Sequence, residues 1–137
     1  MEKIKVRVGW CDKNYSCVTE CEELNGFVIV AKNTLEELKK GLKESVKLHI
    51  EACLKDNDEL PDWIVSGQYE FDYIYETSAL LHSLDGVLSQ SAIARASGID
   101  KKIIGHYASG YRNPRPKQRE KIISGIHAIS RELAAVS

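Results

Sequence analysis

Apolar and polar residues alternate at the start of the chain. Apolar residues occupy the even positions from Ile4 to Trp10, and Lys3, Lys5 and Arg7 lie between them. This period of two predicts a half-buried strand. The turn-like residues 12–14 then predict a hairpin and a second strand over 15–21. After a further turn, the near-continuous apolar run 27–31 predicts a third strand that is buried on both faces, central in its sheet or covered by a helix.

From residue 34 the spacing of apolar residues changes to three and four. The sequence Thr34-Leu35-Glu36-Glu37 has the pattern of a capping box, in which Thr34 accepts a hydrogen bond from the N–H of Glu37 and Glu37 reaches back to the N–H of Thr34. An amphipathic helix is expected from here to about Leu54. Its apolar stripe consists of Leu35, Leu38, Leu42, Val46, Ile50 and Cys53. His49 lies beside this stripe. We expect it to pack at the edge of the core and not to act as a ligand.

The period of two returns after an acidic loop over 55–62. The loop lacks the regular spacing of a calcium-binding loop, so a solvated loop is expected. Residues 69–75 predict a fourth strand, with four aromatic side chains at alternate positions. Such an aromatic face is either an interaction surface or the cover of a core, and core packing is the interpretation that we adopt.

Residues 77–137 predict helices only. A first helix is expected over 77–84, two short helices over 90–96 and 100–109, and a last helix from about Pro116. Gly98 suits a left-handed turn between the two short helices, and Asp100 has the chemistry of an N-cap. A small shared core is expected from Ile93, Ala94, Ile99, Ile104 and Tyr107. The last helix is amphipathic, and its spare apolar residues, Ile123 and Val136, indicate a dimer seam.

The second short helix has basic and donor groups at its N-terminal end. A rigid helix of this kind fits a DNA major groove. The outward residues are expected to be Lys101, Lys102, Ile103, Gly105 and His106. The alternative is that the two helices serve only for protein contacts.

Composition indicates an ordinary soluble chain. Its 137 residues are 43% hydrophobic and 28% charged, enough for one medium domain or two small ones. No apolar run approaches the roughly 20 residues that span a bilayer, and the N-terminus has no apolar signal segment. We therefore expect a cytoplasmic protein without membrane partners.

Charge is unevenly distributed. Residues 1–77 contain 10 Lys and Arg against 16 Asp and Glu, which gives −6, and residues 78–137 contain 9 against 4, which gives +5. The basic part can bind phosphates with release of counterions. The acidic part would attract a basic protein, although acidity that merely aids solubility explains it about as well.

The four cysteines do not indicate a metal site. Cys11, Cys17 and Cys21 have the spacing C-x5-C-x3-C, whereas zinc sites favour closely spaced C-x2-4-C pairs. Cys17 and Cys21 are expected on one face of the second strand, as small apolar groups. Reduced thiols, no metal and no cofactor are expected.

The helical part resembles a known family of DNA-binding domains. The run SQ-x3-A-x3-GI-x4-I-x2-Y-x2-G-x-R-x-P, from Ser89 to Pro114, is similar to the helix-turn-helix of the phage-repressor-like (Xre/Cro) family. The resemblance spans roughly 77–136. It implies that Lys101, Lys102 and His106 read bases. It also implies phosphate contacts from Gln90 and from residues 109–113, among them Ser109, Tyr111 and Arg112, and the basic residue Arg115 is expected to join them.

The first part resembles the N-terminal domain of HicB-type antitoxins. The residues that carry this resemblance are Asp12, Tyr15, Leu24, Gly26, Thr34 and Glu37. The resemblance covers about residues 3–75, and many such antitoxins carry a helix-turn-helix in second place. It implies that the first domain binds and inhibits a small basic toxin ribonuclease of the HicA type.

The sequence thus predicts an α+β chain with a β-β-β-α-β domain over 1–76 and an all-α helix-turn-helix domain over 77–137. The expected function is that of an antitoxin of a type II toxin–antitoxin system, which inhibits its toxin and represses its own operon by binding operator DNA as a homodimer or higher homo-oligomer. The alternative is a stand-alone helix-turn-helix transcriptional regulator with a ligand-sensing or oligomerising first domain. An enzyme is not expected, because the strand order only loosely resembles part of a ribonuclease H sheet and no carboxylates are placed to hold two metals.

Overall fold

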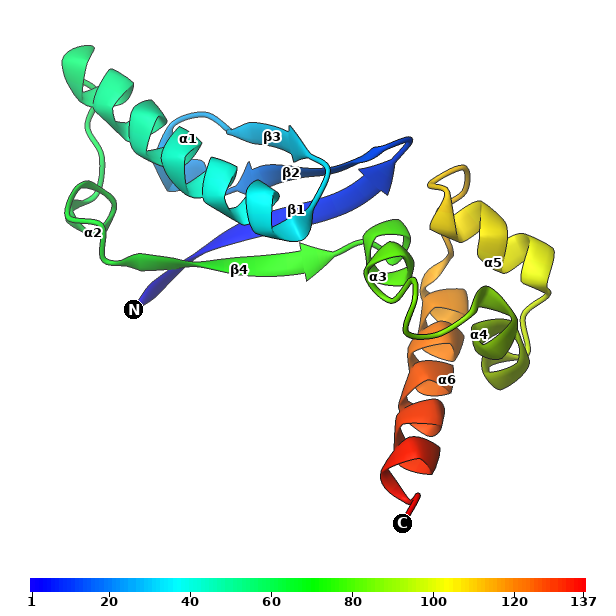
Figure 1. Ribbon diagram of the computed structural model, residues 1–137. Helices are drawn as coiled ribbons and strands as arrows, with labels where there is room; N and C mark the ends of the chain where they lie inside the picture. Colours follow the sequence, from blue (N-terminus) through cyan, green and yellow to red (C-terminus); the bar gives the residue numbers. More distant parts are fainter. The chain divides into compact units, whose positions relative to one another are not determined.

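The computed structural model describes residues 1–137, which form two compact units (Figure 1). Unit 1 is Met1–Glu76 and unit 2 is Thr77–Ser137. The fold is mixed α+β, with one four-stranded sheet and six α-helices, so the expected class is confirmed. None of the helices is both long and apolar enough to cross a membrane.

The sheet of unit 1 has the spatial order β3-β2-β1-β4. Its strands are β1 (Glu2–Cys11), β2 (Asn14–Glu20), β3 (Ile29–Lys32) and β4 (Tyr69–Tyr75). β1 and β2 form an antiparallel hairpin, and β3 pairs antiparallel with β2. β4 pairs with β1 in parallel, which requires a long crossover connection between them.

The crossover contains α1 (Leu35–Lys55), which lies across one face of the sheet (Figure 1). The predicted stripe is buried at Leu38, Leu42, Val46, Ile50 and Cys53. The hydroxyl of Thr34 accepts from the N–H of Glu37 at 3.1 Å, which is one half of the expected capping box, and the return bond from Glu37 is not formed. The observed order also includes two short helices that were not expected, η1 (Glu22–Leu24) and α2 (Asp62–Val65).

The prediction of a strand buried on both faces was wrong for residues 27–31. β3 begins at Ile29 and is an edge strand. Val28 and Val30 are buried, but Phe27 and Ile29 are 68% and 63% exposed. Since α1 covers only one face of the sheet, alternate residues of β3 face solvent. A short apolar run does not reveal which strand ends at the edge of a sheet.

His49 on α1 has a structural role. Its Nε2 lies 2.8 Å from the carbonyl oxygen of Leu24 and 3.5 Å from the Sγ of Cys53. Because a carbonyl oxygen can only accept, this contact assigns the ring proton to Nε2. Because this nitrogen already carries a proton, it cannot accept the thiol proton of Cys53. His49 therefore ties α1 to the turn after β2, and the pair is not a nucleophilic dyad.

The cysteines differ in accessibility. Cys17 is buried as expected, but Cys21 lies just beyond the end of β2 and its thiol donates to the carboxylate of Glu23 at 3.2 Å. Burial raises the pKa of the Cys17, Cys21 and Cys53 thiols, while Cys11 is exposed.

We expect Cys11 to react first with a thiol reagent such as 5,5′-dithiobis(2-nitrobenzoate) at neutral pH, because only the thiolate attacks. Cys17 and Cys53 should react only after denaturation. Stopped-flow absorbance of the native protein should show one fast thiol, which Cys11→Ser removes. A fast phase of two or more thiols, or one that survives Cys11→Ser, would contradict this assignment.

Unit 2 is a bundle of four helices. They are α3 (Thr77–Ser83), α4 (Gln90–Ser97), α5 (Lys101–Ala108) and α6 (Pro116–Ala134). The expected core residues Ile93, Ile99, Ile104 and Tyr107 are buried, together with Leu81 and Ile122. Ala94 lies at the edge of this cluster. Arg119 on α6 donates to the hydroxyl of Thr77 at 2.7 Å and so fixes the start of α3.

Candidate nucleic-acid interface

Helices α4 and α5 are joined by the tight turn that the sequence predicts. The hydroxyl of Ser89 caps α4 by accepting from the N–H of Ala92 at 3.0 Å. Gly98 ends α4 in the left-handed conformation, with φ of 73°, which costs a glycine little. The carboxylate of Asp100 then starts α5 by accepting from the N–H of Lys102 at 2.8 Å. The expected roles of Gly98 and Asp100 are confirmed.

The start of α5 is exposed and basic. Lys101 and Lys102 are both exposed, and neither forms an ion pair. The positive end of the helix dipole lies at the same place. Two free ammonium groups and this dipole can bind an anionic backbone or the acceptor edge of a guanine.

The middle of α5 differs from the expected outward face. Ile103 is half-buried and packs against the core of unit 2, so the prediction that it faces outward was only partly right. Gly105 lies beneath Gln90, since a Cβ added at Gly105 would be 3.6 Å from the Oε1 of Gln90. The exposed charged side chains of α5 are therefore concentrated in its first turn and do not extend along the whole helix.

His106 is less free than a base-reading residue would be. Its ring lies 5.1 Å from that of Tyr111, centroid to centroid, at a tilt of 52°. Its Nδ1 is buried without a hydrogen-bond partner. Nε2 is the ring nitrogen left for a contact with DNA, and the ring also supports Tyr111.

The loop after α5 is held by its own backbone. The hydroxyl of Ser109 donates to the carbonyl of His106 at 3.1 Å and accepts from the N–H of Tyr111 at 3.3 Å. The N–H of Arg112 donates to the same carbonyl at 3.3 Å. Tyr111, Arg112 and Arg115 have exposed side chains. An ordered backbone with free guanidinium groups suits contacts to phosphates.

Gln90 and Ser109 meet at one shallow depression of about 210 Å³. Gly105, His82 and Asp85 also line it. The carboxylate of Asp85 would repel a phosphate inside the depression, so phosphate contacts belong at its Gln90 and Ser109 rim. The candidate residues thus lie towards both ends of α5, which is about 12 Å long. Lys101 and Lys102 are in its first turn, and Ser109, Tyr111, Arg112 and Arg115 follow its last residue.

No three His, Cys, Asp or Glu side chains gather closely enough to hold a metal ion. Comparisons with family models, with curated proteins and with solved structures find no match for this chain. The two resemblances therefore rest on the residues that carry them in this sequence.

Proposed function

We propose that this protein is an antitoxin and autorepressor of a type II toxin–antitoxin system. Unit 2 binds operator DNA as a homodimer, and unit 1 binds and inhibits a small basic toxin ribonuclease of the HicA type. The observation that carries the DNA-binding part is the capped α4-turn-α5 pair, with Lys101 and Lys102 exposed and unpaired at the start of α5. This arrangement matches the way a helix-turn-helix enters a major groove.

Charge supports a different partner for each unit. Unit 2 carries 9 Lys and Arg against 4 Asp and Glu, and unit 1 carries 10 against 16. A net charge of +5 on unit 2 favours a polyanion through counterion release. A net charge of −6 on unit 1 favours a basic protein and speeds its association. The hairpin, the strand after it and the helix that begins after Thr34 are the elements that the HicB resemblance implies for unit 1.

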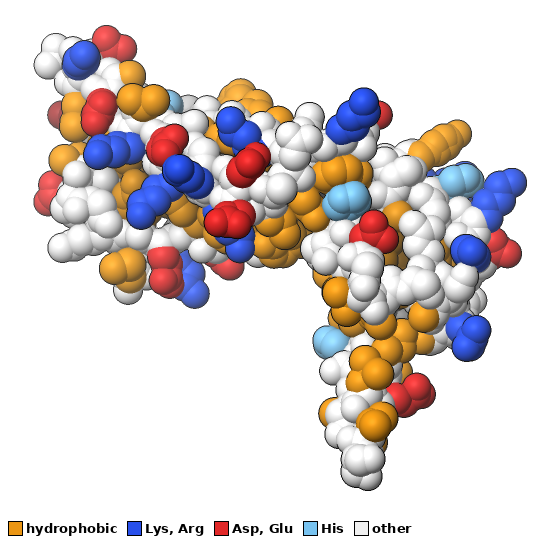
Figure 2. Space-filling model, in the orientation of Figure 1, with side chains coloured by type: hydrophobic (Ala, Val, Ile, Leu, Met, Phe, Trp, Pro, Cys, Tyr) orange, Lys and Arg blue, Asp and Glu red, His pale blue; other side chains and the backbone are white.

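The C-terminal half of α6 supports a dimer. Figure 2 shows hydrophobic side chains along this helix towards the C-terminus, where Leu133 and Val136 are 62% and 78% exposed. Ile126 and Ile129 are half-buried on the same stripe, spaced by three and four residues. A second copy packing along this stripe would bury it, and a dimer supplies the two reading helices that a site with two half-sites requires.

Leu133→Glu is therefore expected to convert the dimer to a monomer, because the charge would have to be buried in the seam. Without the second copy, affinity for a two-half-site duplex should fall by about 100-fold. Light scattering and fluorescence anisotropy measure the two effects, and Ser130→Glu, at an exposed polar position of α6, is the control. An unchanged molar mass in the Leu133→Glu protein would remove α6 as the seam.

Arg112→Ala is expected to weaken binding to all DNA sequences alike by about 10-fold, the value of one charge-assisted hydrogen bond to a phosphate. The slope of log affinity against log salt should become shallower by about 1. Anisotropy titrations over a range of salt concentrations give both quantities. An unchanged slope would take Arg112 off the phosphate-binding surface.

A pull-down of the tagged protein from its own host, followed by mass spectrometry, tests the antitoxin part. The expected result is a small basic protein encoded next to this one, whose ribonuclease activity the purified protein suppresses. Recovery of DNA with no such protein would support the alternative, a stand-alone regulator. The groove in unit 1 described below is the observation that favours a ligand-sensing first domain in that case.

A further inference from the structure

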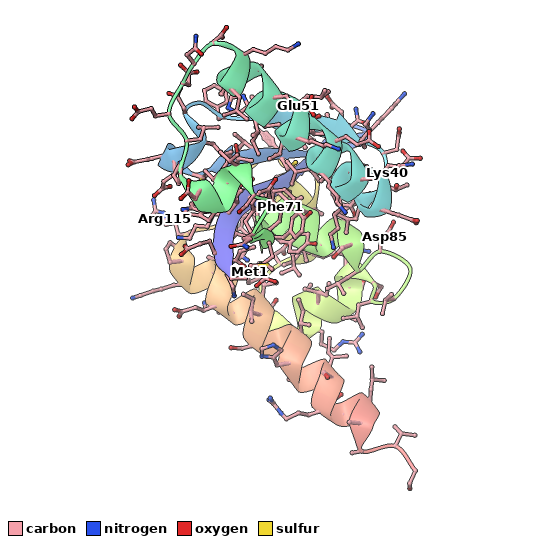
Figure 3. All side chains as sticks on the ribbon, turned by 90° about the vertical axis from the view of Figure 1, so that its left-hand side faces the viewer. Met1, Lys40, Glu51, Phe71, Asp85 and Arg115 are labelled. Carbon is pink, nitrogen blue, oxygen red and sulfur yellow. The ribbon has the colours of Figure 1, made fainter.

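Unit 1 has an open groove between α1, α2 and the edge strand β4. Its volume is about 660 Å³, within the roughly 300–1,000 Å³ that is usual for small-ligand sites. Figure 3 labels two of its lining residues, Glu51 on α1 and Phe71 on β4. The groove remains open because β4 has no neighbouring strand on its outer side.

The walls of the groove are largely apolar. They are formed by Ile50, Leu54, Ile64, Val65, Tyr69 and Phe71. Leu54 and Val65 are 43% and 48% exposed, and the rings of Tyr69 and Phe71 stand edge to face with centroids 5.7 Å apart. Covering this surface would be favourable in proportion to the apolar area removed from water. Two half-buried rings also offer a rigid wall for a flat or chain-like apolar group.

The charged groups at the rim are two lysines and two glutamates. Lys43 and Lys47 are one helical turn apart on α1, and neither forms an ion pair. The hydroxyl of Ser66 lines the groove and makes no hydrogen bond. The acidic groups are Glu51, one turn beyond Lys47, and Glu70, whose carboxylate pairs with Lys3 at 3.9 Å. The free positive charge therefore lies at the Lys43 end.

We propose that this groove binds a small amphipathic anion. An apolar ring system or chain would lie against Tyr69 and Phe71, and its carboxylate or sulfonate would be held by the ammonium groups of Lys43 and Lys47. This site is separate from the DNA-binding surface of unit 2 and does not depend on the proposed DNA binding or on a toxin partner.

Two fluorescent probes test the proposal. 8-Anilinonaphthalene-1-sulfonate has an apolar ring system with an anionic head, and N-phenyl-1-naphthylamine has the rings without the charge. The chain has two tryptophans, and the ring of Trp63 lies 6.4 Å from that of Tyr69 in the groove wall. In Trp10→Phe protein, quenching of the Trp63 emission therefore reports a probe bound to unit 1 near Tyr69, and substitutions of groove residues then show whether that probe lies in the groove.

The expected result is saturable one-to-one quenching by the sulfonate. The double variant Lys43→Gln/Lys47→Gln should raise its dissociation constant by about 5- to 10-fold, the effect of removing two solvent-exposed charges. The control variant Lys40→Gln/Lys55→Gln removes two lysines of α1 that do not line the groove and should have no effect. The uncharged probe should bind both double variants equally, and Val65→Glu should abolish quenching by the sulfonate.

Three results would overturn the proposal. The first is an equal loss of sulfonate affinity in the two double variants, and the second is sulfonate binding without quenching of Trp63. The third is a shift towards monomer in the Val65→Glu protein, measured by light scattering, because a second copy of the chain would then be the occupant of the groove.

Discussion

Gly125→Val is expected to lower the free energy of unfolding of unit 2 by about 2–3 kcal/mol, the upper part of the usual range for overpacking. Gly125 is buried on α6 where that helix crosses the end of α4. A Cβ at this position would lie 2.9 Å from the backbone N of Ser97 and 3.0 Å from the carbonyl carbon of Ala96. Because both neighbours are backbone atoms, the helices themselves would have to separate. A unit of about 60 residues has little stability to spare.

The two units can be followed separately in one urea titration. Both tryptophans, Trp10 and Trp63, belong to unit 1, so their emission reports unit 1, while the far-ultraviolet circular dichroism of the helices includes unit 2. We expect Gly125→Val to move only the circular dichroism transition to lower urea. Ser124→Val, at the exposed position next to it, is the control. Since serine and valine have similar helix propensities, Ser124→Val should have little effect, and equal shifts in the two variants would mean that the close crossing at Gly125 does not set the effect.

The double variant Lys101→Ala/Lys102→Ala is expected to weaken binding to the preferred DNA sequence by about 100-fold, since each good contact to a base edge contributes about 1–3 kcal/mol. Binding to unrelated DNA should fall much less. The ratio of specific to non-specific affinity therefore decreases, unlike in Arg112→Ala, where it should stay constant. Anisotropy with two duplexes, one preferred and one scrambled, gives this ratio.

Lys117→Ala/Lys121→Ala is the matched control, because it removes the same charge from exposed positions of α6 outside the α5 surface. If this control loses as much specific affinity as the α5 variant, only the net charge of unit 2 matters. The assignment of Lys101 and Lys102 as base-reading residues would then be wrong.

The features that the sequence predicted well are local ones. The alternation in β1, the Thr34 cap of α1, the left-handed Gly98 and the Asp100 cap each depend on a few adjacent residues. Their backbone preferences are set by side chains within one turn or one strand. The buried positions of α4 and α5 followed from helical spacing in the same way.

The features that it missed depend on which elements meet in space. The edge position of β3, which exposes Phe27 and Ile29, follows from the strand order. The need for a glycine at 125 follows from the crossing of α6 with α4, and the sequence gives no periodic signal for it. The contact of His106 with Tyr111 likewise joins a helix to the loop after it. The groove of unit 1 could not be inferred either, because α2 was not expected.

We propose that unit 2 reads a specific duplex sequence. The most direct measurement is affinity selection of fragmented genomic DNA from the protein's own host by the purified full-length chain, followed by sequencing, with Lys101→Ala/Lys102→Ala protein in parallel. We expect one enriched inverted repeat, located upstream of this protein's own coding sequence and lost in the variant. Enrichment of no sequence, or the same enrichment in the variant, would contradict it.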